Sequence, residues 1–218
     1  MSKLKLYFAP GACSLAPHIA LREARLDYDL EKVDLRTHLT SQEDDFNAIN
    51  PKGYVPALVL EDGQLLTEVA AILLYIADRV PERHLAPPAT TLERYRLYER
   101  LNYLATEIHK GFSPLFSPAT SDELRLFIKG RLLARLELLN EAVATQTYLG
   151  GANFDVSDAY LITLLTWARW TQVELSSLPA LEAYRDRMLA HPSVHDAIET
   201  EKALRTRTTP RVAPPVNL

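Results

Sequence analysis

A proline-rich break divides this sequence into two parts whose hydrophobic patterns differ. The segment PERHLAPP, residues 81–88, contains three prolines and no apolar period, which is typical of a linker. Before it, two-residue and helical periods are mixed, whereas after it the apolar residues repeat only at helical spacing. The 218 residues are enough for two modest domains of these kinds. We therefore predict a mixed domain over 1–80, a linker over 81–90, a helical domain over 91–205 and an irregular tail over 206–218.

The pattern of the mixed domain predicts the element order β-α-β-α-β-β-α. Alternation over residues 3–8 predicts the first strand, and the pair Pro10-Gly11 ends it. Asp62-Gly63 lies between two short apolar runs and is a strong hairpin signal. Apolar residues at helical spacing from Val69 to Val80 predict the last helix of this domain.

The second part of the sequence predicts only helices, two of them short and covering 178–190 and 193–204. Asp155, followed three residues later by Asp158, predicts a capping box at the start of one helix. Three apolar stripes indicate the longer helices. They comprise Leu97, Leu101, Leu104 and Ile108; Leu124, Ile128, Leu132, Leu136, Leu139 and Val143; and Val156, Tyr160, Thr163, Leu164 and Trp167.

The composition argues against several classes of protein. A net charge of −4, from 24 basic and 28 acidic residues, disfavours an electrostatic grip on nucleic acid. No apolar stretch approaches the ~20 residues that span a bilayer, and the start MSKLKLYFAP lacks the apolar core of a secretory signal. The single cysteine, Cys13, excludes an intramolecular disulfide and a zinc site built on cysteine pairs. We therefore expect a reducing, cytoplasmic location. The histidines show no metal spacing, so we expect no metal site, and we also expect no tightly bound cofactor.

Cys13 follows the first strand and its Pro-Gly turn, at or just before a predicted helix. The unpaired N–H groups and the partial positive charge of a helix N-terminus favour a thiolate there. Such a thiolate attacks a disulfide, or the cysteine and an N–H group together hold the thiolate of another molecule. A small buried hydrophobic residue is the alternative, because free cysteines are usually buried. The absence of a second cysteine excludes a dithiol redox cycle.

The segment Asn50–Pro56 leads into the third predicted strand. A proline directly before a strand can be cis, which turns the preceding backbone outward and lets Val55 offer its N–H and C=O to an extended peptide. A plain loop is the alternative. Glu68 follows Thr67 at the start of a helix and suits an ammonium group, although a first-turn charge that favours the helix dipole is the commoner explanation.

A polar group lies late in the first helix after the linker. His109 and Lys110 could donate hydrogen bonds to an anion or polarise a thiol, and Glu107 precedes them by two residues. The alternative is a solvated helix end, because the dipole also favours a cation at Lys110.

These features occur together in an order that resembles one family. The segments that carry the resemblance are YFAPGACSLAPHIALRE, DLRTHLT, INPKGYVPAL, LLTEVAAILLYIAD, ERLNYLATEIHKGFSPLF and FDVSDAYL. Together they are highly specific, and the sequence resembles a glutathione transferase of the bacterial beta class from about Leu4 to Leu204.

The resemblance implies an α+β, thioredoxin-like N-terminal domain, an all-helical C-terminal domain and a homodimer that binds reduced glutathione as a co-substrate. It places Cys13 at the sulfur of glutathione. It implies that Val55, before a cis Pro56, pairs with the cysteinyl part of glutathione and that Glu68 meets the γ-glutamyl end. The helical-domain residues that it assigns to the site are Asn102, His109, Lys110 and Glu107, of which Glu107 reaches the glutathione of the partner subunit.

Two positions in the expected glutathione site depart from the family pattern. Val69 stands where many relatives have serine or glycine, so the backbone N–H remains but a hydroxyl contact to the γ-glutamyl carboxylate is lost. Tyr54 stands where relatives often have glutamine, which can hydrogen-bond the peptide. We expect glutathione to bind despite both changes.

The expected function is conjugation of the glutathione thiolate to a small electrophile held against apolar walls of the helical domain. In an alternative reaction, disulfides or peroxides are reduced through a mixed disulfide on Cys13. Replacing Cys13 by alanine distinguishes the two, because conjugation uses the sulfur of glutathione. A non-catalytic interaction module with the same fold is a third hypothesis, disfavoured because it has no chemical need for Cys13, His109 or Lys110.

Overall fold

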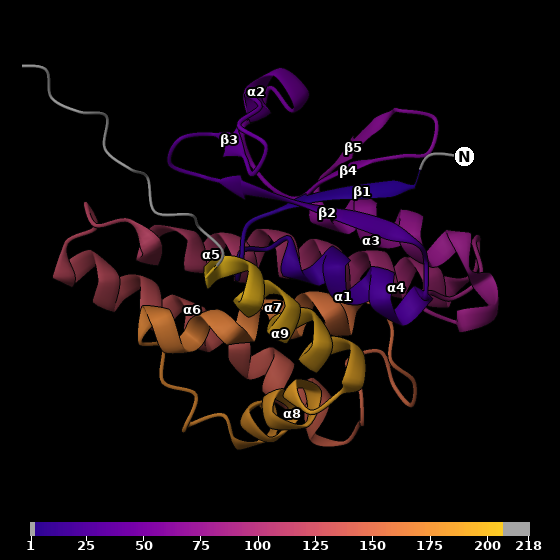
Figure 1. Ribbon diagram of the computed structural model, residues 1–218. Coiled ribbons are helices and arrows are strands. Elements are labelled where there is room, and N and C mark those ends of the chain that lie inside the picture. The colour runs from indigo at the N-terminus through magenta and orange to yellow at the C-terminus, as the bar shows by residue number, and fades with distance from the viewer. Residues whose placement is uncertain (1–2, 207–218) are drawn as a thin grey trace, which may run out of the picture.

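A computed structural model of the chain describes residues 3–206. The tail predicted over 206–218 lies, after Thr206, outside the described residues. The first part of the chain forms β1 (Leu4–Phe8), α1 (Leu15–Ala24), β2 (Tyr28–Asp34), β3 (Leu39–Thr40), α2 (Phe46–Ile49), β4 (Ala57–Val59), β5 (Leu65–Thr67) and α3 (Val69–Arg79). In Figure 1 this sheet lies at the top of the molecule, with α1 and α3 on the face nearest the helical part.

The five strands form one mixed sheet in the order β3-β2-β1-β4-β5. The central strand β1 pairs in parallel with β2 and antiparallel with β4, so that Leu6 lies opposite both Leu30 and Leu58. Strands β4 and β5 form the hairpin that Asp62-Gly63 predicts. The edge strand β3 adds one element to the predicted order, because a strand of two residues is too short to show a hydrophobic period.

The second part of the chain is helical. It comprises a 3₁₀ turn η1 (Pro81–Arg83), α4 (Leu92–Tyr103), a π-helix η2 (Leu104–His109), α5 (Lys110–Phe112), a 3₁₀ turn η3 (Ser113–Phe116), α6 (Asp122–Ala144), α7 (Val156–Thr171), α8 (Pro179–Leu189) and α9 (Pro192–Thr206). The run from α4 to η3 is continuous, and the looser π turn within it changes which residues share a helix face. None of the described helices is long and apolar enough to cross a membrane.

One hydrophobic core extends across both parts of the chain. It runs from Leu4 and Leu6 of the sheet, through α1 and α3, to α7. A smaller cluster around Tyr7 and Phe46 fills the opposite face of the sheet. Nearly all of α7 is buried, because it lies between α1, α3 and the other helices of the bundle. The two parts are therefore packed together over a continuous apolar contact.

The predicted apolar stripes are buried except at two positions near the start of α6, where Leu124 is exposed and Ile128 is half-buried. Leu97, Leu101 and Ile108 are buried as expected, and so is most of the stripe on α6. Leu124 at the start of α6 is wrong as a core prediction, because its side chain is 47% exposed. Leu124 lines a groove between α6 and the run from η2 to η3, so helical spacing continues there along a surface that is open to solvent.

The capping box predicted for α7 is present. Asp155 accepts hydrogen bonds from the Ser157 N–H at 2.7 Å, while Asp158 accepts from the Asp155 N–H at 2.9 Å. Asp158 also accepts from the Leu149 N–H and from the hydroxyl of Tyr184, both at 2.7 Å. Burial raises the pKa of Asp158 to about 7. The box thus ties the buried helix to the loop before it and to α8.

Candidate active site

A cleft of about 420 Å³ opens between the two parts of the chain. One wall is formed by the first part of the chain, through the β1–α1 loop, the segment before β4 and the start of α3. The opposite wall is formed by η2, α5 and α7 of the helical part. Eight of the ten predicted site residues line this cleft, namely Cys13, Tyr54, Val55, Pro56, Glu68, Val69, His109 and Lys110. The fold thus brings together residues that lie up to about a hundred positions apart in the sequence.

Cys13 lies directly before Ser14, the N-cap of α1. Its thiol donates a hydrogen bond to the carbonyl oxygen of Val55 at 3.2 Å. Burial raises the pKa of Cys13 to about 12; the backbone N–H groups of Cys13 and Ser14 and the charge of Lys110 act in the lowering direction but are outweighed. The thiolate that a helix N-terminus favours is therefore not the form found here, and Cys13 is a neutral thiol at pH 7.

The backbone of Val55 faces the cleft as an open edge. The Val55–Pro56 peptide bond is cis, and the chain enters β4 directly after it. Within residues 3–206 the Val55 N–H has no hydrogen-bond partner, while its carbonyl accepts only the Cys13 thiol. Asn50, which is buried, donates to the Tyr54 carbonyl at 2.7 Å and so holds this segment in place. The side chain of Tyr54 itself is exposed.

Glu68 adopts a backbone conformation that residues other than glycine rarely take, with φ of 73°. This conformation turns the chain from β5 into α3 and leaves the Glu68 carboxylate exposed in the cleft. Lys52 donates to that carboxylate at 2.7 Å and to the hydroxyl of Thr67 at 3.0 Å. Val69 is buried in the core, so only its backbone is available to a ligand.

Sequence reasoning missed Lys52. A single lysine in a turn has no spacing that distinguishes it from a solvated charge. Its position between Pro51 and Gly53, in the segment that leads to Val55, was the available signal. In the structure it is the cation that neutralises Glu68.

His109 and Tyr160 form the helical wall of the cleft. Nδ1 of His109 lies 2.7 Å from the hydroxyl of Tyr160, which was predicted only as a core residue of α7. Burial, and secondarily the charge of Lys110, lowers the pKa of His109 to about 4, so its ring is neutral at pH 7. Burial also raises the pKa of Tyr160, which therefore keeps its proton. The ring of Trp167 packs edge-on against His109, with centroids 5.0 Å apart.

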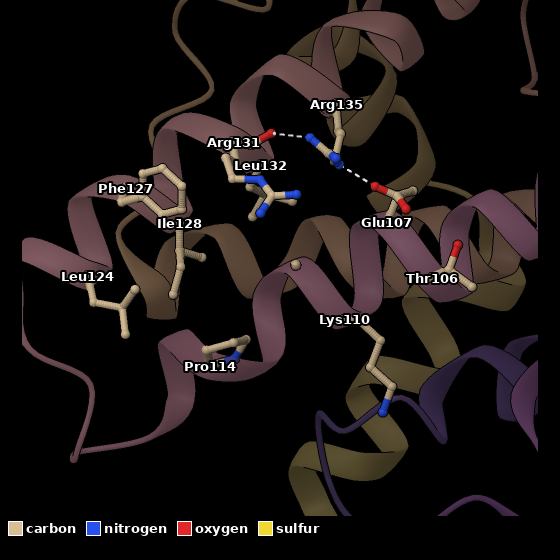
Figure 2. A pocket seen from close by; sticks show the side chains of 11 residues that line it. Thr106, Glu107, Lys110, Pro114, Leu124, Phe127, Ile128, Arg131, Leu132 and Arg135 are labelled. Atoms are coloured by element: carbon tan, nitrogen blue, oxygen red, sulfur yellow. Dashed lines mark hydrogen bonds and ion pairs between the residues drawn. The ribbon is translucent and has the colours of Figure 1, made fainter.

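Two predicted site residues lie outside the cleft. Asn102 is exposed on α4, about two turns before His109, and its amide donates to the Tyr98 carbonyl at 2.9 Å. Glu107 points into a neighbouring groove between η2 and α6, where it pairs with Arg135. Figure 2 shows the side chains of Glu107 and Arg135 facing each other, with Lys110 extending away from them. Glu107 and His109 lie two residues apart and therefore face different sides of the helix, so only His109 reaches the cleft.

No group of three or more histidine, cysteine, aspartate or glutamate side chains that could hold a metal ion occurs within residues 3–206. The polar groups of the cleft include a neutral thiol, an open backbone edge, one carboxylate, two lysines and the His109–Tyr160 pair. These groups suit a zwitterionic ligand with a peptide backbone and a sulfur atom, because each finds a complementary partner.

Comparison with known proteins identifies the family. The model of the glutathione S-transferase N-terminal domain matches residues 11–79, and that of the C-terminal domain matches residues 103–192. The chain is 46% identical over 198 residues to glutathione S-transferase GstA of Escherichia coli O157:H7, covering 91% of this chain and 98% of that protein.

Solved structures give the same result. The bacterial beta class glutathione S-transferase of Sphingomonas chungbukensis is 47% identical, with a TM-score of 0.87 over 90% of this chain and 98% of that one. A sphingomonad glutathione S-transferase in complex with glutathione is 45% identical, with a TM-score of 0.88 over 91% of this chain and 98% of that one. The chain therefore belongs to the glutathione S-transferase family and resembles its bacterial beta class.

Proposed function

We propose that the protein transfers the thiolate sulfur of reduced glutathione to a small electrophile in the cleft between its two domains. The observation that carries this proposal is the meeting of the Cys13 thiol, the open backbone edge of Val55 and the cation of Lys110 in one cleft. The name of GstA and the glutathione bound in the sphingomonad structure support the same function.

Glutathione is held mainly through its backbone and its charged ends. The unpaired N–H and the carbonyl of Val55 pair with the cysteinyl residue, and the single proton of the Cys13 thiol turns from that carbonyl to the sulfur of glutathione when the ligand binds. Glu68 accepts from the γ-glutamyl ammonium group. Lys52 forms an ion pair with Glu68 in this structure, and it donates to a carboxylate of glutathione when the ammonium group of the ligand takes its place.

Neutral hydrogen-bond donors and one cation stabilise the bound thiolate. With a pKa of about 12, Cys13 keeps its proton at pH 7 and donates it to the sulfur, where a second thiolate would repel it. When Tyr160 donates to Nδ1 of His109, the proton of the neutral ring lies on Nε2, the nitrogen left for the cleft. Lys110 adds a positive charge.

In the reaction, the thiol of bound glutathione first loses its proton to solvent. Its sulfur then attacks the electrophilic carbon, a C–S bond forms, and the leaving group departs with the electron pair of the bond that breaks. The electrophile rests against aromatic side chains of the helical domain. Phe116 and Phe112 pack edge-on against Trp167, and Phe116 is 46% exposed and available for contact.

Disulfide or peroxide reduction through Cys13 is the weaker alternative. That chemistry needs Cys13 as a thiolate, and a pKa of about 12 leaves a negligible thiolate fraction at pH 7. The interaction-module hypothesis is weaker still, because it gives no reason for a cleft that collects Cys13, His109 and Lys110.

Conjugation of reduced glutathione to chlorodinitrobenzene, followed by absorbance, tests the proposal. We expect turnover that saturates with glutathione, and a loss of about tenfold in kcat for Lys110→Ala because one thiolate-stabilising charge is removed. Lys202→Ala, at an exposed lysine of α9, is the matched control. A protein saturated with glutathione that conjugates no member of a broad electrophile panel would contradict the proposal.

We also propose that the active form is a cytoplasmic homodimer. Exposed apolar side chains on α4 and α6, including Leu92, Tyr95 and Phe127, support a partner surface there. Glu107 and Asn102 lie outside the cleft of their own chain, which is compatible with the role toward a partner subunit that the resemblance implies for Glu107. A free cysteine and the need for reduced glutathione support a reducing compartment.

A further inference from the structure

The loop that presents Cys13 is held by side chains of the helical domain. The Gly11 N–H donates to Oε2 of Glu201 on α9 at 2.8 Å, and the Gly11 carbonyl accepts from Nε1 of Trp167 on α7 at 2.9 Å. The preceding carbonyl, of Pro10, accepts from Arg205 at 3.1 Å. The N–H and the carbonyl of Gly11, two residues before Cys13, are thus both held by residues more than 150 positions away in the sequence.

Gly11 is required for this contact. Its φ is +79°, a conformation that favours glycine, and a Cβ atom there would lie 2.4 Å from Cη2 of Trp170. The loop therefore lies directly against α7, and a shift of the loop would move Cys13 with it. In Figure 1, α9 lies beside α1, the helix that begins after this loop.

Glu201 is a buried carboxylate, only 3% exposed. Its other oxygen, Oε1, accepts from Nδ1 of the fully buried His18 at 3.0 Å. Nε2 of His18 in turn accepts from Nε of Arg22 at 3.4 Å, which leaves Nδ1 of His18 as the donor to Glu201. Arg22 also donates to Thr200 of α9 at 2.7 Å. A chain of hydrogen bonds thus runs from a partly exposed guanidinium group to the amide of Gly11.

A carboxylate is costly to bury, so its place at this point requires an explanation. Neither His18 nor Arg22 lines the glutathione cleft, and Glu201 does not touch it either. What the network reaches is the backbone two residues before Cys13. Its effect on the reaction must therefore pass through the position of that loop.

We propose that Glu201 is a positioning residue of the transfer reaction, which acts through Gly11 to fix Cys13 against the helical wall of the cleft. This inference rests on the proposed function. Trp167 makes the same link from the other side, because its Nε1 holds Gly11 while its ring packs against His109. Through Trp167, α7 therefore contacts both the loop that carries the Cys13 thiol and the His109 imidazole on the other wall.

The groups that face the bound thiolate are Cys13, His109, Lys110, Tyr160 and Glu68. Of these, only Cys13 depends on the Gly11 loop for its place. Loss of the Glu201 contact should therefore weaken the donation from Cys13 to the glutathione sulfur. Binding of the rest of glutathione, by Val55 and Glu68 on other segments, should be little changed.

The test compares Glu201→Ala and Glu201→Gln with Glu199→Ala, an exposed glutamate of the same helix that pairs only with Lys202 among the described residues. For each, the absorbance of the bound glutathione thiolate is followed against pH, together with kcat, KM for glutathione and calorimetric affinity. For Glu201→Ala we expect a higher apparent pKa of the bound thiol and a kcat lower by about tenfold, with affinity within about threefold of wild type.

The amide oxygen of Glu201→Gln can still accept from Gly11, so we expect its apparent thiol pKa and its kcat to return toward the wild-type values. Glu199→Ala should match wild type. If Glu201→Ala does not fold, Trp167→Phe decides, since it removes the Nε1 donor and keeps a ring against His109. Unchanged thiol pKa and kcat in the folded variants would overturn the inference. Absence of conjugation by the wild-type protein would instead contradict the proposed function itself.

Discussion

Cys13 and His109 lie on opposite walls of one cleft, and burial opposes the ionised form of each. It raises the pKa of Cys13 to about 12 and lowers that of His109 to about 4. The sequence left two interpretations of Cys13 open, a thiolate favoured by the helix N-terminus and a small buried residue, and the structure shows a largely buried neutral thiol at the cleft. The charge of each side chain depends on how deeply the folded protein buries it, and the depth of burial cannot be read from the sequence.

Replacing Cys13 tests its role as a donor. Cys13→Ser keeps a hydroxyl that can donate to the glutathione sulfur, so kcat for conjugation should stay within about threefold of wild type. Cys13→Ala removes the donor and should lower kcat by about tenfold or more while glutathione still binds. Steady-state kinetics and calorimetry measure both effects. Complete loss of conjugation in Cys13→Ala, with glutathione bound, would show that Cys13 is the nucleophile.

The lowered pKa of His109 predicts a dependence of stability on pH. Above pH 6.5 the ring is neutral in both states; between 6.5 and about 4 the unfolded chain binds more protons, so stability falls as the pH falls. The loss is complete below about pH 4 and amounts to up to about 3 kcal/mol for this shift. Denaturant unfolding should show that His109→Gln loses less stability than wild type between pH 7 and pH 4.

His195→Gln provides the control for this experiment, because His195 is an exposed histidine on α9. The free energy of unfolding of His195→Gln should depend on pH in the same way as that of the wild-type protein. Equal pH dependence in His109→Gln and wild type would contradict a buried neutral ring at position 109.

At the scale of elements, strong hydrophobic periods predicted the helices well and short or irregular elements poorly. The capping box at Asp155 and the hairpin at Asp62-Gly63 were predicted because their signals are local. The π turn at Leu104–His109 was not, since the apolar spacing of this segment does not distinguish a π turn from an α-helical one. Tyr160 belongs to a regular apolar stripe, and only the position of α7 beside the cleft makes it a site residue.

The capping box of α7 has a measurable effect on stability. Asp155→Ala removes the bond to the Ser157 N–H and an ion pair with Arg100 at 2.7 Å, and should lower the free energy of unfolding by about 1–3 kcal/mol. Asp186→Ala, an exposed acid that pairs with Arg185 on α8, should change it by less than about 1 kcal/mol. Equal effects of the two substitutions, measured by chemical denaturation, would rule out the capping role.

At the scale of the whole molecule, the break at residues 81–88 predicted the two architectures but not how they associate. The two parts share a continuous core through α1, α3 and α7, and the cleft exists only because they are packed together. Nothing in a hydrophobic period specifies that contact. The apolar side chains left on α4 and α6 point to a further association, between chains.

Phe127→Glu tests that association. Phe127 is 60% exposed on α6, and a buried, unpaired carboxylate at a dimer contact should shift the protein toward monomer by at least about tenfold in dissociation constant. Leu189→Glu, on α8, is the matched control and should leave the assembly unchanged. Sedimentation measurements report both. A wild-type protein that sediments as a monomer at micromolar concentration would contradict the proposed homodimer.

Calorimetric titration of the reduced protein with reduced glutathione tests the central claim most directly. The cleft predicts saturable binding with one glutathione per chain, weakened by about tenfold in Glu68→Gln, which loses the carboxylate for the γ-glutamyl ammonium group. Such a result would support glutathione as the ligand of this cleft despite Tyr54 and Val69. No detectable heat of binding at millimolar glutathione would contradict the claim.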